Sequence, residues 1–232
     1  MCKLPDKIQA KNKTQLKRLI DYAFKHNIYD LNFIDTSKIT NMSNLFMNCE
    51  YDIDVSNWDV SNVTTTFCMF VGCKKFNSDL SNWDVSNVKN MNNMFYCCKN
   101  FDCDLSNWNV SNVTDMYSMF TACENFKGKG LDNWDVSKAE DMRFMFYNCK
   151  NFNCDLSNWD MSKALRINEM FYGCKNFEGK GLENWKLEKT LFYYDIFTGC
   201  DKVKLPSWYK AFLKRCNLEF LNKSLNFFKF VL

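Results

Sequence analysis

The sequence predicts an α/β solenoid, on three observations that share one spacing. Trp recurs in steps of 25, 25, 26, 25 and 26 residues, at Trp58, Trp83, Trp108, Trp134, Trp159 and Trp185. A Phe follows twelve residues after each of them, at Phe70, Phe95, Phe120, Phe146, Phe171 and Phe197. A Cys follows three residues later again, at Cys73, Cys98, Cys123, Cys149, Cys174 and Cys200. A fixed period of this length indicates stacked coils that bury one another's apolar residues.

The period sets the number of coils and the domain boundaries. An earlier, degenerate unit has Ile34 at the Trp position and retains Phe46 and Cys49, so we expect about seven coils. The unbroken period predicts one domain for the 232 residues. We expect a leader and capping helix over 1–30, the repeat solenoid over 31–204 and a C-terminal cap over 205–232.

Composition and charge restrict the classes of function. Aromatic residues make up 17% of the chain, and their fixed places in the repeat predict that they pack the core. The net charge of +3 gives no indication of a nucleic-acid partner. No secretory signal is visible at the start, and no segment approaches the roughly 18 apolar residues of a membrane span.

The thirteen Cys residues do not resemble a disulfide framework. Seven of them, with Cys49 included, occupy one position of the repeat, where Cys serves as a small apolar filler. The odd total leaves at least one thiol free. We therefore expect buried thiols in a reducing compartment, which favours the cytoplasm.

The N-terminal cap is predicted to be a helix from Lys13 to His26. Its apolar residues fall at helical spacing, at Leu16, Leu19, Ile20, Ala23 and Phe24. Either Asn12 or Thr14 is the expected N-cap, and residues 1–12 are expected to form a loose leader. An amphipathic helix before the first coil covers the open apolar end of a solenoid.

Each coil is expected to contain a short strand and a short helical turn. Leu80, Trp83 and Val85 have the spacing of a leucine-rich repeat, whose strand lines a parallel sheet. Apolar residues then follow at the three-and-four spacing of a helical turn, at Met91, Met94, Phe95 and Cys98. The predicted class is therefore a leucine-rich-repeat-like, right-handed solenoid with helical caps.

Two connections in the repeat are one residue longer than the others. They read KGKGLDN over 127–133 and EGKGLEN over 178–184. Gly130 and Gly181 permit positive φ, so we expect the extra residue to bulge outward without disturbing the stack.

The repeat pattern fades after Cys200. Leu205 and Trp208 keep the Leu-to-Trp spacing, but Pro206 lies between them. Residues 206–232 are rich in aromatic and aliphatic side chains with interspersed Lys. We expect a C-terminal cap here; the alternatives are a membrane-surface helix or an oligomer contact.

The repeat phrases NWDVSNV, MFYCCKNF and MFYNCKNF resemble a known family. They are similar to the 25- or 26-residue repeats of the BspA-like leucine-rich-repeat family, often called bacterial surface proteins, over about residues 31–200. The resemblance implies a leucine-rich-repeat-like solenoid that binds proteins, and some members of the family are adhesins. Because members are commonly secreted or lipid-anchored, the resemblance favours the cell surface.

The candidate partner-binding residues are polar positions beside the inward positions of the predicted strand. One column contains Asn57, Asn82, Asn107, Asn133 and Asn158, and the next contains Asp59, Asp84, Asn109, Asp135 and Asp160. Either these side chains bond backbone amides of the following turn, or they face a partner or cations. The first interpretation predicts that removing the carboxylates lowers the melting temperature, and the second that it weakens partner binding more.

No catalytic, cofactor or metal site is predicted. The single His, His26, falls in the cap helix, and no repeat places a base beside a nucleophilic Cys. The pairs Cys98/Cys103 and Cys149/Cys154 lie in coils two apart, roughly 10 Å by strand spacing. That is too far for one zinc ion, whose bonds to sulfur are about 2.3 Å.

The sequence therefore predicts a non-catalytic protein-binding module that presents the strand-lined face to a protein partner. The resemblance makes it adhesin-like. An intracellular scaffold or inhibitor is the alternative, and a metal or redox protein is a third class that only the Cys count favours.

Overall fold

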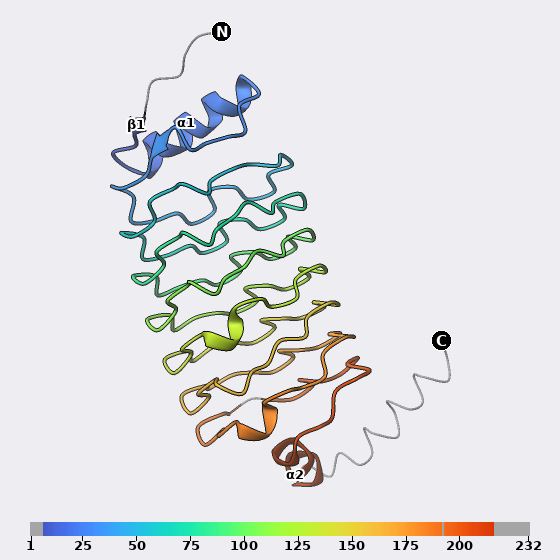
Figure 1. Ribbon diagram of the computed structural model, residues 1–232. Helices are drawn as coiled ribbons and strands as arrows, with labels where there is room; N and C mark the ends of the chain where they lie inside the picture. The colour runs from blue at the N-terminus through green and yellow to red at the C-terminus, as the bar shows by residue number, and fades with distance from the viewer. Residues whose placement is uncertain (1–6, 192, 216–232) are drawn as a thin grey trace.

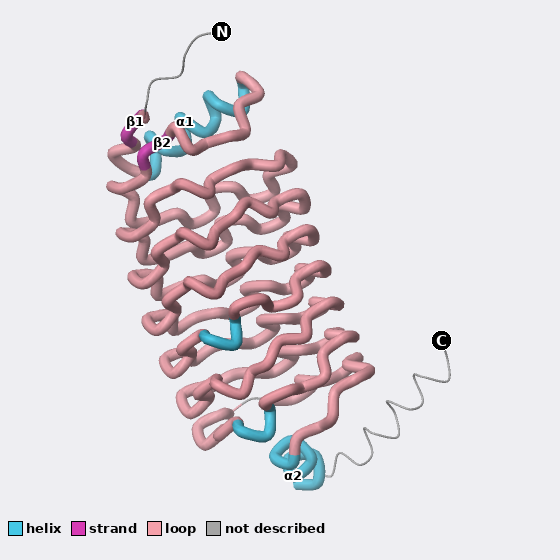
Figure 2. The backbone as a smooth tube through the Cα atoms, in the orientation of Figure 1, coloured by secondary structure: helices cyan, strands magenta, loops and turns pink. Residues whose placement is uncertain are grey.

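The computed structural model describes residues 7–191 and 193–215. The chain forms a stack of coils that follow one another in sequence order (Figure 1). Helix α1 (Lys13–Lys25) lies at one end of the stack and helix α2 (Ser207–Arg215) at the other. Apart from these two helices, the strands β1 (Ile8–Gln9) and β2 (Ile34–Asp35) and the 3-10 turns η1 (Leu131–Asn133) and η2 (Leu182–Asn184), the described chain is loops and turns (Figure 2).

One side of each coil is joined to the next coil by a parallel ladder of backbone hydrogen bonds. In the third coil the N–H of Met91 donates to Asp115 O at 2.9 Å, and that of Phe95 donates to Met119 O at 2.9 Å. Between these bonds, the N–H of Met94 turns back to Met91 O at 3.1 Å. We call this side the ladder face; it comprises residues 41–48, 65–72, 90–97, 115–122, 141–148, 166–173 and 193–199.

Parallel bridges mark where the ladder begins in successive coils. They are Asn41↔Thr65, Thr65↔Asn90, Asn90↔Asp115, Asp115↔Asp141 and Asp141↔Arg166. Two residues of each ladder segment have positive φ, for example Asn93 at 55° and Cys97 at 61°. At the second of these positions Gly72 adopts positive φ without strain and leaves room for the side chain of Asn48.

The predicted helical turn over 91–98 is therefore wrong. Apolar residues three and four apart fit a succession of β-turns as well as a helix. In this chain alternate N–H groups bond the next coil, whereas a helix directs each N–H to its own preceding turn.

The predicted strand at Leu80, Trp83 and Val85 is also wrong. The N–H of Trp83 closes a turn on Leu80 O at 3.1 Å, and that of Val88 closes one on Val85 O at 2.9 Å. The spacing of the apolar residues gave their burial correctly, but turns rather than a strand place them inward. We call this side the turn face; it comprises residues 54–62, 79–87, 104–112, 130–138 and 155–163.

Columns of identical side chains fill the core between the two faces, and the Phe, Trp and Cys columns are among them. The Phe rings stack from coil to coil, as Phe95 does on Phe120 at 5.6 Å between ring centroids. The Trp rings stack likewise, with Trp83 and Trp108 6.5 Å apart and nearly parallel. All Phe and Trp residues at these repeat positions are buried, as predicted.

The Trp and Cys columns also join the coils, because each side chain donates a second hydrogen bond to a core carbonyl that already accepts a backbone N–H. Trp108 Nε1–H donates to Leu80 O of the preceding coil at 2.9 Å. The Cys98 thiol donates to Phe70 O at 2.9 Å, and the same bond recurs at each later Cys of the column. Cys is therefore more than a filler, because its weak S–H donor reaches the preceding coil.

Helix α1 covers the first coil as predicted. It buries Leu16, Ile20 and Ala23, and the N-cap is Asn12, whose Oδ1 accepts the Gln15 N–H at 3.0 Å. The expected loose leader is wrong for β1, which pairs in parallel with β2. Helix α1 does not pair with the backbone edge of β2, and β1 covers that edge.

Helix α2 continues the core at the other end. The Trp208 ring stacks on Trp185 at 6.3 Å, and its Nε1–H donates to Leu182 O at 2.8 Å. The helix thus supplies one more member of the Trp column, as the Leu205-to-Trp208 spacing indicates. The predictions for the aromatic segment 216–232 lie outside the described residues.

The two longer connections contain left-handed glycines, as predicted, with φ of 90° at Gly130 and 88° at Gly181. The extra residue does not simply bulge outward. A Cβ at Gly130 would lie 2.5 Å from the Cα of Ser106, so the backbone packs directly on the preceding coil. Lys129 O accepts the N–H of Leu105 at 3.1 Å, which adds a bond between coils.

Candidate functional site

The ten residues predicted to bind a partner all lie exposed on the turn face. They form two columns that run along the stack, the Asn column and the Asp column. Because the predicted strand is absent, these columns do not line the ladder. The prediction that they belong to a strand-lined face is therefore wrong, although their exposure is confirmed.

The Asp column is engaged in local hydrogen bonds. Asp84 Oδ1 accepts the backbone N–H of Ser86 at 3.0 Å. The residue two positions on donates in the same way to Asp59, Asn109, Asp135 and Asp160. Hydrogen bonds from Ser137 lower the pKa of Asp135, and those from Ser162 lower the pKa of Asp160. These oxygens hold the turn, as the structural interpretation predicts.

The Asn column connects neighbouring coils at several positions. Asn107 Nδ2 donates to Ser81 O at 3.3 Å, and Asn158 Nδ2 donates to Asp132 O at 3.2 Å. The N–H of Asn57 donates to Asn32 Oδ1 at 2.8 Å. These side chains therefore contribute to the stack as well as to its surface.

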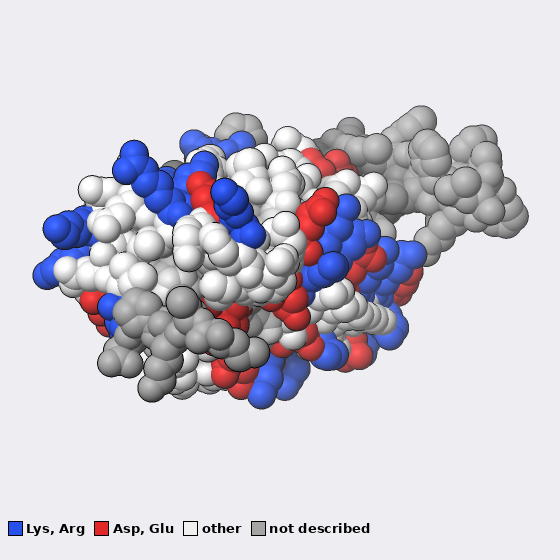
Figure 3. All heavy atoms as spheres, turned by 90° about the horizontal axis from the view of Figure 1, so that it is seen from above, with Lys and Arg blue, Asp and Glu red and all other residues white. Residues whose placement is uncertain are grey.

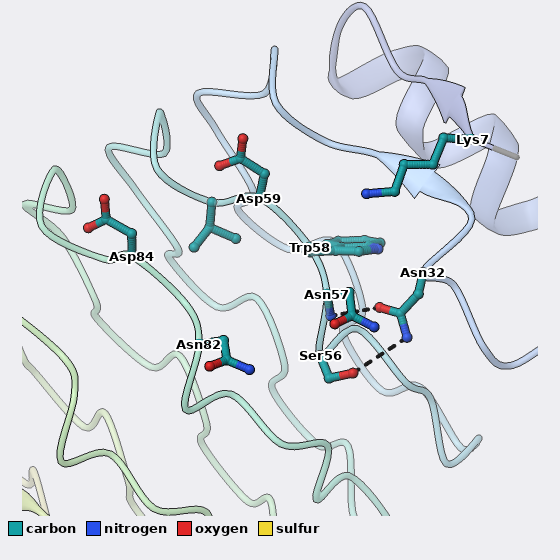
Figure 4. A pocket seen from close by; sticks show the side chains of 9 residues that line it. Lys7, Asn32, Ser56, Asn57, Trp58, Asp59, Asn82 and Asp84 are labelled. Atoms are coloured by element: carbon teal, nitrogen blue, oxygen red, sulfur yellow. Dashed lines mark hydrogen bonds between the residues drawn. The ribbon is translucent and has the colours of Figure 1, made fainter.

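Four of the predicted residues come together in an open pocket of about 600 Å³ near the N-terminal cap (Figure 4). Its lining is formed by Lys7, Asn32, Ser56, Asn57, Trp58, Asp59, Val60, Asn82 and Asp84. Figure 4 shows Asp59 and Asp84 side by side, with Asn57 and Asn82 below them. The other six predicted residues do not line this pocket and continue along the stack.

The ladder face carries a set of aromatic side chains that the sequence reasoning missed. Besides Tyr193, whose ring packs on Phe212, seven lie outside the Phe and Trp columns, at Phe67, Tyr96, Tyr117, Phe144, Tyr147, Tyr172 and Tyr194. Phe67 and Tyr96 are each 37% exposed, and Tyr194 is 48% exposed. Most of the others are half-buried, so their rings contribute to the surface.

Four of these rings form a continuous run across three coils. Tyr117 lies 5.6 Å from Phe144, Phe144 lies 5.9 Å from Tyr147, and Tyr147 stacks on Tyr172 at 4.8 Å between ring centroids. The sequence contains only a partial signal for these rings. These aromatics fall nine, ten or thirteen residues after the Trp position, where residue types change from coil to coil, so the prediction that nearly all aromatics pack in the core is wrong for them.

A charged cluster lies beside this run. Asp141 accepts the Arg143 guanidinium, with Nη2 at 2.6 Å and Nε at 2.9 Å, and Arg166 at 3.2 Å. The Arg143 guanidinium also lies 4.9 Å from the centroid of the Tyr117 ring. A cation is thus held between a carboxylate and a tyrosine ring on this face.

Most of the thiols that the structure describes are buried. Burial raises the pKa of Cys123 and Cys174 well above the ordinary value, and that of Cys200 to about 12, so these thiols stay protonated. Over residues 7–191 and 193–215, no group of three or more His, Cys, Asp and Glu side chains is placed to hold a metal ion. His26 bonds Tyr22 O through Nδ1 at 2.8 Å, at the end of α1.

Elsewhere on the surface, opposite charges pair between coils. Glu124 bridges Lys99 and Lys150, Asp104 pairs with Lys129 at 2.7 Å, and further pairs join Asp102 to Lys127 and Asp155 to Lys180. Seen from the α1 end, basic and acidic side chains alternate along the side of the stack (Figure 3).

In the described part of the chain, no helix is long and apolar enough to cross a bilayer.

These features define a repeat protein whose coils are joined by backbone on one face and largely by side chains on the other. A family model described as "Mycoplasma protein of unknown function, DUF285" matches residues 14–131 and again residues 104–210. The chain belongs to this family. No curated protein and no solved structure matches it significantly. The resemblance to BspA-like repeats stays a prediction.

Proposed function

We propose that the chain is a non-catalytic protein-binding module that presents the ladder face to a partner protein. The observation that supports this most strongly is the run of rings from Tyr117 to Tyr172 on a surface whose backbone groups already bond to neighbouring coils. Tyr, Phe and Arg are enriched at protein interfaces and carry much of the binding energy there. A ring that points outward and does not pack in the core is available to contact a partner.

The coil stack suits this role because it is preorganised. Hydrogen bonds join each coil to the next at several positions, so little chain entropy is lost when a partner docks. The class that we propose for the stack is the leucine-rich-repeat-like, right-handed solenoid, in which contacts are spread over successive coils.

Two versions of this function differ in location. The adhesin-like version rests on the resemblance to bacterial surface proteins. The intracellular scaffold or inhibitor is favoured by the thiols, since each Cys that the structure describes is free. A partner recovered from the cell exterior would support the first version, and a cytosolic partner the second.

Affinity capture with three forms of the protein tests the proposal. The ladder-face variant is Tyr147→Ala/Tyr172→Ala, and the turn-face variant is Asn107→Ala/Asn133→Ala. We expect the wild type and the turn-face variant to capture the same proteins, and the ladder-face variant to lose them. Loss with the turn-face variant alone would instead assign binding to the Asn and Asp columns.

A further inference from the structure

The C-terminal half of the ladder face combines exposed apolar side chains with acidic ones. Tyr194 is 48% exposed, on a face where most apolar side chains point inward, and Leu191, just before the last ladder segment, is 70% exposed. We call the surface on the ladder face the acidic patch; it comprises Tyr147, Glu169, Tyr172, Tyr194 and Asp195. An exposed apolar surface of this kind marks an interaction site.

The two carboxylates of the acidic patch occupy equivalent positions in neighbouring coils. The N–H of Glu169 donates to Tyr194 O at 3.1 Å, which places Asp195 on the adjacent rung. Burial, followed by the charge of Asp195, raises the pKa of Glu169. Like charges on adjacent rungs are destabilising unless a cation compensates them.

No such cation comes from the part of the chain that the structure describes. Within residues 7–191 and 193–215 the Glu169 carboxylate makes no ion pair or hydrogen bond, and Asp195 accepts one bond, from the Thr198 hydroxyl at 3.2 Å. The carboxylates that bridge coils elsewhere do have Lys or Arg partners, as Asp141 and Glu124 do. The acidic patch therefore lacks the compensation that its counterparts have.

The chain itself shows what a cation does on this face. At Asp141 the Arg143 guanidinium lies between a carboxylate and the Tyr117 ring. Glu169 offers a carboxylate without a cation, and Tyr172 lies three residues further along the same rung. The acidic patch thus has the carboxylate and the ring of the Asp141 site but lacks its guanidinium.

We infer that the acidic patch binds a basic segment of the partner protein, with Lys or Arg side chains at Glu169 and Asp195 and apolar side chains on Tyr147, Tyr172 and Tyr194. The inference rests on the proposed function, since it names the chemistry of the partner at the same face. Charge-assisted hydrogen bonds and contacts between cations and rings both favour such a segment.

A library of random dodecapeptides displayed on phage and selected against the whole chain is the probe. Selected peptides are then synthesised, and their affinities are measured by fluorescence anisotropy. We expect Lys or Arg next to aliphatic or aromatic residues in the selected sequences. We also expect affinity to fall about tenfold in Glu169→Gln/Asp195→Asn, and to fall as NaCl rises from roughly 50 to 500 mM.

The matched control removes the same charge from the turn face, in Asp84→Asn/Asp135→Asn, and should bind the peptides like the wild type. Selected peptides without basic residues, or equal affinity for the Glu169→Gln/Asp195→Asn variant, would overturn the inference. If only Tyr147→Ala/Tyr172→Ala loses the peptides, the proposed function stands and the basic partner is wrong. If neither ladder-face variant loses them, the proposed function fails as well.

Discussion

The ladder face and the turn face enclose the same core but hold the coils together by different means. On the ladder face the backbone does so, as in the bond from Phe95 N–H to Met119 O. On the turn face side chains make many of the bonds, as Asn87 Nδ2 does to Ser61 O at 2.7 Å. A side chain that bonds one coil to the next must be the same residue type in every coil. Where the backbone makes these bonds, the residue type can differ from coil to coil.

This difference explains why some positions of the repeat keep one residue type and others vary. The phrase NWDVSN recurs because its Trp, Asp and Asn side chains are occupied in the fold. The position nine residues after the Trp is not restricted in this way, and it contains Phe67, Asn92, Tyr117, Arg143, Asn168 and Tyr194. Residues that repeat within the chain thus build the fold, whereas this variable position lies at the surface in every coil except at the buried Asn168 and is available for specificity.

The largest expected effect comes from breaking the core that both faces share. Phe120 stacks between Phe95 and Phe146 at 5.6 and 5.7 Å. Phe120→Ala leaves a cavity within the column, and we expect the free energy of unfolding to fall by about 3–5 kcal/mol. Urea unfolding followed by circular dichroism measures it. A loss under about 1 kcal/mol would mean that the column is not packed as described.

The next largest loss of stability should come from removing one hydrogen-bond donor on the turn face, compared with a matched change on the ladder face. Trp108→Phe keeps the ring but removes the Nε1–H that Leu80 O accepts in the core. Leu80 O still accepts the Trp83 N–H, so losing this second hydrogen bond should cost about 0.5–1.5 kcal/mol. The control on the ladder face is Tyr147→Phe, which should leave the unfolding midpoint unchanged. Equal effects in the two variants would contradict the separate roles of the faces.

Removing a carboxylate should lower the stability on the turn face but not on the ladder face. Asp84→Ala removes the acceptor of the Ser86 N–H, and by analogy with capping side chains we expect a loss of about 1 kcal/mol. Glu169→Gln removes a charge that burial and Asp195 disfavour, so stability should stay equal or rise. Thermal unfolding of both variants checks this; a large loss in Glu169→Gln would show that its carboxylate has a cationic partner within the fold.

The smallest effect is the pH dependence of the ion pairs between coils. Hydrogen bonds from Lys side chains hold the pKa of Asp104, Glu124 and Asp155 at about 2, below the unfolded values. The stability that they contribute is therefore present above about pH 4 and is lost as the pH falls through about 2. Each pair is exposed, so we expect under about 1 kcal/mol from each.

Unfolding midpoints measured between roughly pH 5 and pH 2 follow this loss. Replacing Lys129, Lys150 and Lys180 by Met should flatten the curve. An unchanged curve would assign the acid sensitivity to other groups.

The sequence is sufficient to predict which residues form the core, but not the backbone conformation that places them there. Trp108, Phe120 and Cys123 are buried where the period places them, because a residue fixed in each coil must face its copies. The spacing of Met91, Met94 and Phe95 does not distinguish a helical turn from successive β-turns. The left-handed residues gave little warning either, since Asn93 and Cys97 stand where glycine is usual.

The candidate site shows the same limit. The exposure of Asn82 and Asp84 could be predicted, because they flank buried Trp83. Their engagement in turns was one of two alternatives. The outward rings of Tyr147 and Tyr172 could not be told from core aromatics without the ladder, since a period alone does not say which strand-like segment carries the hydrogen bonds.

Oxidative footprinting of tyrosines, with and without a saturating selected peptide, tests most directly whether the ladder face is the binding surface. Tyr147, Tyr172 and Tyr194 report on that face. Tyr22, on α1 and 54% exposed, and Tyr51, 41% exposed, lie outside it and serve as internal controls. We predict that the peptide lowers oxidation of the three ladder-face tyrosines severalfold and leaves the two controls unchanged. Protection of Tyr22 or Tyr51 without protection of Tyr147 and Tyr172 would contradict the account.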